Sequence, residues 1–243
     1  MINKHGLKRY IPAEIRREIR QNSGFGCVIC GLGIIQYEHV DPEFNDAKEH
    51  DPVRMTLLCP RCHNKVTTGY LDKEIVKEAM KNPKCLSKGF SNEFFHIGKG
   101  YPKIEFAGSI ISNCPIPIQI KDEPLFVIEP GENGSPFLLS ANFYDTKGNL
   151  SLEIKQNEWN AYISNWDIEV IGGAITIREK EGKINLKLSA KYPDILEVSD
   201  LDMYKKDVRI KANLKDFSVY HGEVLKCTFS SCFADNCAIG FKM

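Results

Sequence analysis

Four cysteines in two closely spaced pairs are the residues of this chain most suited to chemistry. Cys27-Val-Ile-Cys30 and Cys59-Pro-Arg-Cys62 are separated by 28 residues. Four thiolates presented as two CxxC pairs are typical of tetrahedral zinc, and a site closed by four cysteines leaves the metal no open position. Because a small domain with a few short elements needs such a cross-link, we expect these cysteines to bind a structural Zn²⁺.

Two histidines and an acidic residue accompany the cysteine pairs. Glu38-His39 falls between the pairs, and His63-Asn64 directly follows the second one. The stretch CVIC…YEHV…LLCPRCHNKVT resembles the HNH endonuclease family, the ββα-metal or His-Me finger nucleases of the zinc-containing type, over about residues 10–82. The resemblance implies a nuclease site built between a strand and a helix.

The same resemblance implies a role for each of these side chains. Phosphodiester hydrolysis needs an activated water, neutralised phosphate charge and a stabilised leaving oxygen. His39 is then the general base, since an imidazole that titrates near neutral pH suits that task. His63 and Glu38 are then ligands of a catalytic Mg²⁺ or Mn²⁺. The alternative is that both histidines are structural or bind zinc, and it applies most to His63, which adjoins a zinc cysteine.

One position departs from the family pattern. The family's middle asparagine stands five residues before the third cysteine, where this chain has Arg54. That asparagine braces the loop between the strands and orients the base. Asn45, Asp46 or His50, which lie in this loop, are candidates to replace it, and Arg54 is alternatively a phosphate contact.

Basic residues in the first part of the chain are the candidates for binding nucleic acid. Residues 1–85 carry 14 Lys and Arg against 11 Asp and Glu, whereas residues 103–243 carry 16 against 20. Phosphate binding needs local positive charge, which favours the first part. For the basic residues on the expected first helix, the alternative interpretation is that they form an ordinary solvent-exposed surface. The candidates are Arg16, Arg17, Arg20, Arg54, Arg61 and Lys65, with Asn64 as a further polar contact.

The hydrophobic periodicity predicts an α+β fold with two domains. In residues 1–82 the expected elements are short and belong to an HNH domain. They are a helix at 12–22 with Pro12 in its first position, strands at 34–40 and 54–58 joined by a loop at 41–53, and helices at 60–68 and 71–81. Residues 83–102 contain helix and strand breakers throughout and are expected to form a linker.

Residues 103–243 lose helical periodicity and show short alternating runs separated by turns. This pattern predicts a mostly antiparallel all-β domain, with a sandwich as its expected form. Trp159 and Trp166 are expected in its core. Cys227, Cys232 and Cys237 lack metal-site spacing and are expected to be buried free thiols.

The composition favours a cytoplasmic protein, because no apolar run is long enough to span a membrane and the N-terminus is not a secretory signal. We expect a DNA endonuclease, with RNA as an alternative substrate and bacterial restriction or anti-phage defence as a role by analogy. The competing hypothesis is a non-catalytic zinc module that binds nucleic acid or protein. The acidic β domain is expected to serve oligomerisation, protein interaction or ligand sensing rather than wide DNA contact.

Overall fold

Helices and strands occupy different parts of the chain in the computed structural model, which describes residues 2–243. Within that range α-helices occur only before Gly89, and mostly antiparallel strands make up the rest. The expected α+β class is therefore confirmed. The chain forms two compact units, of which unit 1 runs to Glu93 and also includes Tyr162–Val170. Unit 2 consists of Phe94–Ala161 and Ile171–Met243.

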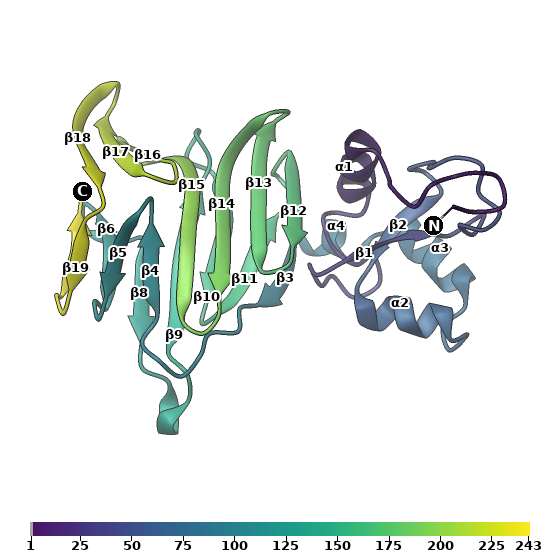
Figure 1. Ribbon diagram of the computed structural model, residues 1–243, viewed down its shortest axis with the longest axis horizontal. Coiled ribbons are helices and arrows are strands. Elements are labelled where there is room, and N and C mark those ends of the chain that lie inside the picture. The colour runs from purple at the N-terminus through teal and green to yellow at the C-terminus, as the bar shows by residue number, and fades with distance from the viewer. Residues whose placement is uncertain (1) are drawn as a thin grey trace. The chain divides into compact units, whose positions relative to one another are not determined.

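Unit 1 contains a short antiparallel hairpin followed by helices (Figure 1). The hairpin pairs Glu38 with Thr56 and His39 with Met55. Its elements are α1 (Ala13–Asn22), β1 (Gln36–His39), β2 (Met55–Leu58), α2 (Pro60–Thr67), α3 (Lys73–Lys81), α4 (Lys84–Lys88), and, at the unit boundary, β3 (Phe90–Phe94) and β12 (Asp167–Ile171).

Local sequence signals account for most of these elements. Ile15 and Ile19 lie one turn apart on α1 and pack against the β2 residues Met55 and Leu57. Proline favours the first position of a helix, and α2 begins at Pro60. Helix α3 begins after Asp72, whose carboxylate accepts a hydrogen bond from the backbone N–H of Glu74.

The segment that we expected to be a linker contains secondary structure, since α4 and β3 lie within it. Cys85 of α4 is fully buried, and its thiol donates to the carbonyl of Gly31 at 3.4 Å. Gly26 lies so close that a Cβ there would be 2.6 Å from the Cys85 sulfur. This tight tertiary contact, rather than helix propensity, holds the short α4 in place, so the hydrophobic periodicity of the sequence does not predict it.

Residues 162–170 belong to unit 1 although they lie between two segments of unit 2. The guanidinium of Arg20 donates two hydrogen bonds of 2.8 Å to the carboxylate of Asp167 and one of 2.8 Å to the Tyr37 hydroxyl. Burial alone would lower the pKa of Arg20, but these hydrogen bonds outweigh it and raise the pKa above its usual value. Trp166 also lies here, beneath the guanidinium of Arg17, so only Trp159 is buried in unit 2 as expected.

Unit 2 is built from mostly antiparallel strands, many of which pair in chain order, and this confirms the expected mostly antiparallel β character. One sheet runs β8-β9-β10-β11, and a larger one contains β13 to β18 in sequence. Figure 1 shows the first sheet behind β13, β14 and β15. Inward side chains alternate with outward ones, as in β9, where Leu139, Ala141 and Phe143 are buried.

The bounds of the unit 2 elements are β4 (Lys103–Phe106), β5 (Ser109–Ser112), β6 (Ile116–Ile120), β7 (Glu123–Pro124), β8 (Phe126–Glu129), the 3-10 helix η1 (Glu132–Gly134), β9 (Leu138–Tyr144), β10 (Leu150–Lys155), β11 (Glu158–Tyr162), β13 (Ala174–Lys180), β14 (Lys183–Lys191), β15 (Ile195–Lys205), β16 (Val208–Ala212), β17 (Asp216–His221), β18 (Val224–Ser230), β19 (Phe233–Asp235) and β20 (Ile239–Lys242).

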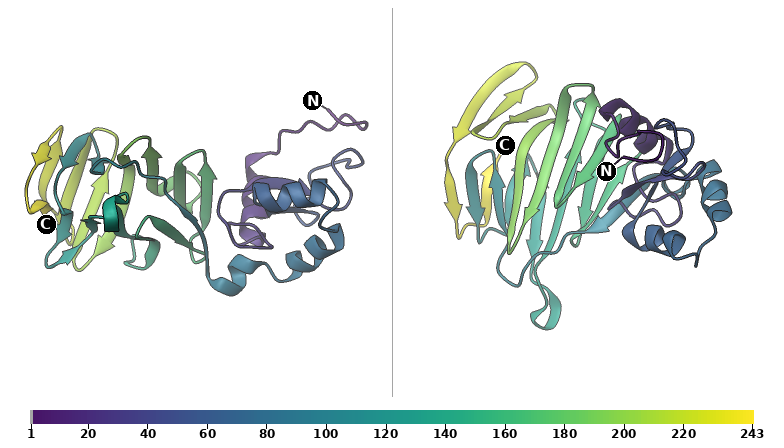
Figure 2. Two further views of the ribbon diagram at one scale, coloured as in Figure 1. Left: turned by 90° about the horizontal axis from the view of Figure 1, so that it is seen from below. Right: turned by 45° about the vertical axis from the view of Figure 1, so that its right-hand side comes forward.

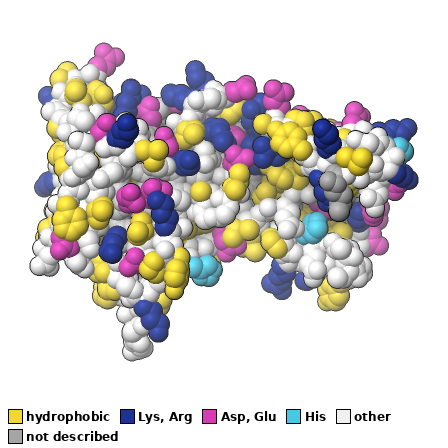
Figure 3. Space-filling view, viewed as in Figure 1, with side chains coloured by type: hydrophobic (Ala, Val, Ile, Leu, Met, Phe, Trp, Pro, Cys, Tyr) yellow, Lys and Arg dark blue, Asp and Glu magenta, His cyan; other side chains and the backbone are white. Residues whose placement is uncertain are grey.

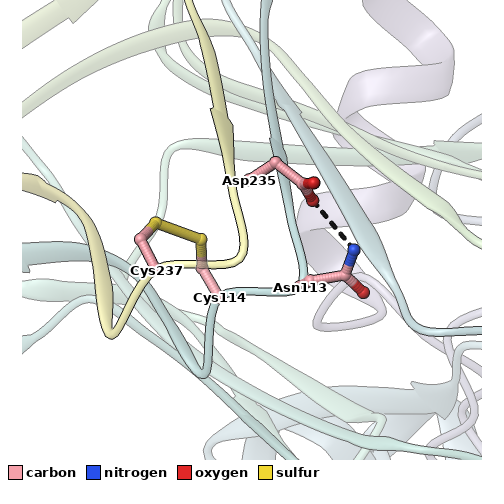
Figure 4. Close-up of a disulfide and its surroundings, with 4 residues drawn as sticks. All are labelled: Asn113, Cys114, Asp235 and Cys237. Carbon is pink, nitrogen blue, oxygen red and sulfur yellow. Dashed lines mark hydrogen bonds between the residues drawn. A yellow bond between two sulfur atoms is a disulfide. The ribbon is translucent and has the colours of Figure 1, made fainter.

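The C-terminal strands of unit 2 return to the strands that begin it. Strand β19 pairs in parallel with β5, and β20 pairs in parallel with β6, as the yellow and teal strands of Figure 2 show. A disulfide joins Cys114 to Cys237 beside a hydrogen bond from Asn113 to Asp235 (Figure 4). The expectation of a free thiol at Cys237 is therefore wrong, because this return of the chain brings it to a distant cysteine.

The other two C-terminal cysteines are free but not buried, since Cys227 and Cys232 are partly exposed. Among the helices of residues 2–243, none combines the length and apolar character that crossing a bilayer would require.

We predict that Asp167→Ala destabilises unit 1 strongly, because it removes the two-pronged contact of a buried guanidinium and leaves it only the Glu169 carboxylate at 3.3 Å. The expected loss in the free energy of unfolding is about 3 kcal/mol. Denaturant unfolding measures it through Trp166 fluorescence in a Trp159→Phe background, since Trp166 lies in unit 1.

The matched control is Asp202→Ala, which removes a similar two-pronged contact to Arg209 at 2.8 and 2.9 Å in a more exposed place. It should cost at most about 1 kcal/mol, followed through Trp159 in a Trp166→Phe background. Equal losses for the two variants would contradict a structural role for the buried pair.

Candidate metal centre and active-site cavity

The four cysteines of the two CxxC pairs converge on one point of unit 1. Their sulfur atoms all lie within 4.8 Å of one another. The sulfur of Cys30 is 3.6 Å from that of Cys59 and 3.8 Å from that of Cys62. A tetrahedral zinc with bonds of about 2.3 Å requires sulfur–sulfur distances of about 3.8 Å. Donor type and spacing therefore fit a structural zinc site.

Local backbone structure presents each pair of thiols. The N–H of Gly31 donates to the carbonyl of Cys27 and closes a turn around the first pair. The second pair spans the start of α2, where the N–H of Cys62 donates to the sulfur of Cys59 at 3.4 Å. A hydrogen bond with Cys30 lowers the pKa of Cys27 to about 5, so the cluster already stabilises a thiolate, the form that binds metal.

A cavity of about 480 Å³ lies within unit 1, and none of the four cysteines lines it. Glu38 and His39 reach it from β1, and His63 reaches it from α2. The three residues that we expected to form the catalytic site therefore line one cavity. The full lining is Arg9, Ile11, Gln36, Tyr37, Glu38, His39, Glu43, Phe44, Asn45, His63, Thr67 and Lys73.

Glu38 and His63 are in direct contact inside the cavity. The Nε2 atom of His63 lies 3.0 Å from Oε2 of Glu38, and both side chains are partly buried. The other carboxylate oxygen of Glu38, Oε1, lies 3.6 Å from the ammonium group of Lys73. Among residues 2–243, the four cysteines form the group of three or more close metal-ligating side chains, and His63 is not a member of it. His63 therefore belongs to the cavity rather than to the sulfur site.

His39 is held by a chain of hydrogen bonds that ends on the backbone. Its Nε2 lies 3.1 Å from Nδ1 of His50, and Nε2 of His50 lies 3.0 Å from the carbonyl oxygen of Lys8. A carbonyl can only accept, so a neutral His50 carries its proton on Nε2 and accepts at Nδ1. His39 must then donate from Nε2, which leaves the lone pair of its imidazole on Nδ1.

The surroundings of His39 favour its neutral form. Burial lowers the pKa of His39 to about 4, and electrostatic interactions with His50, Arg9 and Lys73 act in the same direction. This pKa lies below the near-neutral value that we expected of a general base, because the ring is partly buried among positive charges. At neutral pH the imidazole is therefore uncharged and carries its lone pair on Nδ1.

The N-terminal residues hold the loop between the two strands of the hairpin. The amide of Asn3 donates to the carbonyl oxygens of Phe44 and Ala47, each at 2.6 Å. The guanidinium of Arg9 lies 4.6 Å from the centre of the Phe44 ring, which itself contacts His39 edge-on. No sequence signal identified Asn3 or Arg9, because isolated polar residues near a terminus match no spacing rule.

The three candidates to replace the missing asparagine have different surroundings. His50 is buried and contacts His39, so it is the one that can orient the base. Asn45 is exposed and lines the cavity, whereas Asp46 forms an ion pair with Lys4. Arg54 is exposed and pairs with Asp51 at 3.3 Å.

None of the six expected phosphate contacts lines the cavity of Glu38, His39 and His63, although Arg54 lines a second cavity of about 340 Å³ that His39 also borders. Arg20 is buried and bound to carboxylates, so its expected role in phosphate binding is incompatible with its position. Arg16 pairs with Glu169 at 3.7 Å, and Arg54 pairs with Asp51 as described. Arg17 lies over the Trp166 ring and Lys65 over the Tyr70 ring. Arg61 is exposed on α2. On the face in Figure 3, basic and acidic side chains are interspersed rather than gathered into one basic surface.

The basic residues that do line the cavity are Arg9 and Lys73. Lys73 is the first residue of α3, and its ammonium lies 2.8 Å from Oε1 of Glu43. The sequence predicted the helix of Lys73, but the direction of the Lys73 side chain toward Glu38 depends on how α3 packs.

No protein-family model, curated protein or solved structure matches the chain. The resemblance to the HNH family therefore rests on the residues of this chain and their arrangement alone.

We predict that the protein binds about one zinc ion per chain and that Cys30→Ser or Cys59→Ser greatly reduces it, because three thiolates hold zinc less tightly than four. Elemental analysis measures the zinc, and thermal unfolding with and without a chelator measures its effect on stability. Cys232→Ser, outside the cluster, is the control and should change neither. A metal-free wild-type protein would contradict the zinc assignment.

Proposed function

We propose that this protein is a metal-dependent HNH-type endonuclease that hydrolyses phosphodiester bonds, with the site in unit 1. The observation that carries the proposal is the cavity that Glu38, His39 and His63 share, in a unit whose four CxxC cysteines converge. The chain order β1, β2, α2 agrees with the ββα-metal arrangement that the family resemblance implies. Supporting evidence also comes from the hydrogen bonds that orient His39.

Glu38 and His63 are the residues that would hold the catalytic metal ion. Neighbouring ligands of an octahedral Mg²⁺ with bonds of about 2.1 Å lie about 3.0 Å apart, which is the observed distance between their Oε2 and Nε2 atoms. A carboxylate oxygen and an imidazole nitrogen suit Mg²⁺ or Mn²⁺. When bound, such an ion would neutralise phosphate charge and stabilise the leaving oxygen.

His39 would remove the proton from the attacking water. Its lone pair is on Nδ1 because Nε2 donates to His50, and its neutral form is favoured by burial. After the proton transfer, the imidazolium that forms keeps its hydrogen bond to His50. His50 therefore acts as the positioning residue, in place of the family's asparagine, which is Arg54 in this chain.

DNA is the substrate that we propose, as the family resemblance implies. RNA is the alternative, because the cavity contains no feature that selects between the two. A second candidate function is a zinc module without catalysis. It is favoured by Arg54 at the asparagine position and by the mutual contacts of Glu38, His63 and Lys73, which satisfy one another without a metal. Unit 2 would serve oligomerisation, protein interaction or ligand sensing in either case.

We expect His39→Ala to lower the rate of plasmid nicking by about 10²–10⁴-fold with Mg²⁺ or Mn²⁺, because general-base catalysis is lost. The zinc content should remain that of the wild type. His96→Ala is the control, since His96 is exposed and lies outside the cavity. If the wild type cuts neither DNA nor RNA with any divalent ion, the non-catalytic alternative is favoured.

We also expect His50→Ala to lower the cleavage rate by about 10–100-fold, because His39 loses the acceptor that orients it. His50→Asn should recover part of the rate, since its carbonyl oxygen can accept a hydrogen bond near the position of Nδ1. Single-turnover rates at saturating substrate measure both variants. A His50→Asn variant as slow as His50→Ala would argue that His50 only fills space.

A further inference from the structure

Lys73 occupies a position that the folding of its own helix does not explain. It is the first residue of α3, where the helix dipole disfavours a positive charge. Its side chain is only 27% exposed and extends toward two carboxylates, Glu43 at 2.8 Å and Glu38 at 3.6 Å. The carboxylates of Glu38 and Glu43 in the cavity lining, rather than the helix, therefore hold this ammonium group.

The same carboxylate cannot serve Lys73 and a divalent cation equally well. Glu38 contacts His63 through Oε2 and Lys73 through Oε1, so a cation held by Glu38 and His63 would lie close to the ammonium. Like charges at short range in a partly buried site repel strongly. Lys73 must then move, and its flexible four-carbon stem permits movement. Its other partner, Glu43, has a side chain that is 63% exposed and is free to move with it.

An anion in the cavity would be the new partner of the displaced ammonium. Lys73 and Arg9 are the basic residues of the lining, and the Arg9 guanidinium already lies over the Phe44 ring. We propose that Lys73 is a substrate-binding residue of this cavity, held by Glu38 and Glu43 when no divalent ion is bound and released to a phosphodiester oxygen of nucleic acid when the ion binds. This inference rests on the proposed function for the identity of the substrate.

Lys73→Gln in the full-length, zinc-loaded protein tests the proposal against Lys77→Gln. Lys77 lies one turn later on α3, forms ion pairs with Asp41 at 3.0 Å and Glu74 at 2.7 Å, and does not line the cavity. The two variants remove the same charge from the same helix, so a difference between them reports the position of the charge. Zinc content and thermal unfolding of both variants verify that the fold is retained.

The first measurement is a Mn²⁺ titration followed by electron paramagnetic resonance, without nucleic acid. Lys73→Gln should tighten Mn²⁺ binding at least about threefold, because a competing positive charge leaves Glu38, whereas Lys77→Gln should not. The second is binding of a short labelled DNA duplex over a salt series, with Mn²⁺ present and His39→Ala in every protein to prevent cutting. Lys73→Gln should weaken binding and reduce the slope of log affinity against log salt by about 0.9, the value for one phosphate contact.

Both differences are required. If Lys73→Gln equals Lys77→Gln in either measurement, or if the parent protein binds no duplex, the proposal is overturned. Neither measurement uses cleavage, so the result is distinct from the fate of the proposed function. A wild type that cuts nucleic acid while the two lysine variants behave alike would refute the role of Lys73 alone. A wild type that never cuts, with both differences present, would leave Lys73 as the contact of a binding site and refute the nuclease.

Discussion

Unit 1 depends on the convergence of four sulfur atoms from two places in the chain. One pair follows α1 and the other begins α2, so bringing them within 4.8 Å fixes the turn before β1 against the helix after β2. Because Gln36 at the start of β1 pairs with Leu58 at the end of β2, the sulfur atoms hold the end of the hairpin that lies opposite its connecting loop. Its buried residues Val40 and Leu58 pack with the cysteines themselves in one hydrophobic cluster. Such a small apolar core gains much of its stability from a metal cross-link if one is bound.

The second constraint acts on the loop that connects the two strands of the hairpin. The loop at 41–53 has no regular structure, yet it carries His50, whose ring must stay within hydrogen-bonding distance of His39. The N-terminal residues provide this order, through Asn3 on the loop backbone and the Lys8 carbonyl on His50. A segment that precedes the first helix thus determines the tautomer of a residue in the cavity.

The parts of unit 1 that could be predicted are those that local sequence patterns determine. CxxC spacing identified the sulfur cluster, and periodicity located α1, β1, β2, α2 and α3 to within a few residues. Glu38, His39 and His63 came from a family resemblance, and the structure places them in one cavity.

What could not be predicted depends on contacts between distant residues. The choice of His50 among three loop residues needed the position of Lys8, and the direction of Lys73 needed the packing of α3. The burial of Arg20 needed Asp167, which lies 147 positions later. The Cys114–Cys237 disulfide likewise needed the parallel return of β19 and β20, because cysteine spacing alone does not reveal such pairing.

The late segment in unit 1 has a consequence for how the protein is made. When Glu93 leaves the ribosome, the sulfur cluster and the hairpin can already assemble, but Arg20 has no carboxylate to meet. Domains usually fold as units during synthesis, in order from the N-terminus. Here the first unit stays incomplete until Asp167 and Glu169 emerge, by which time β4 to β11 have been translated. The carboxylate anchor of Arg20, which donates to Tyr37 in the cavity lining, would then form only after much of the second unit is translated. A nascent chain that stalls early would carry this arginine unpaired with Asp167.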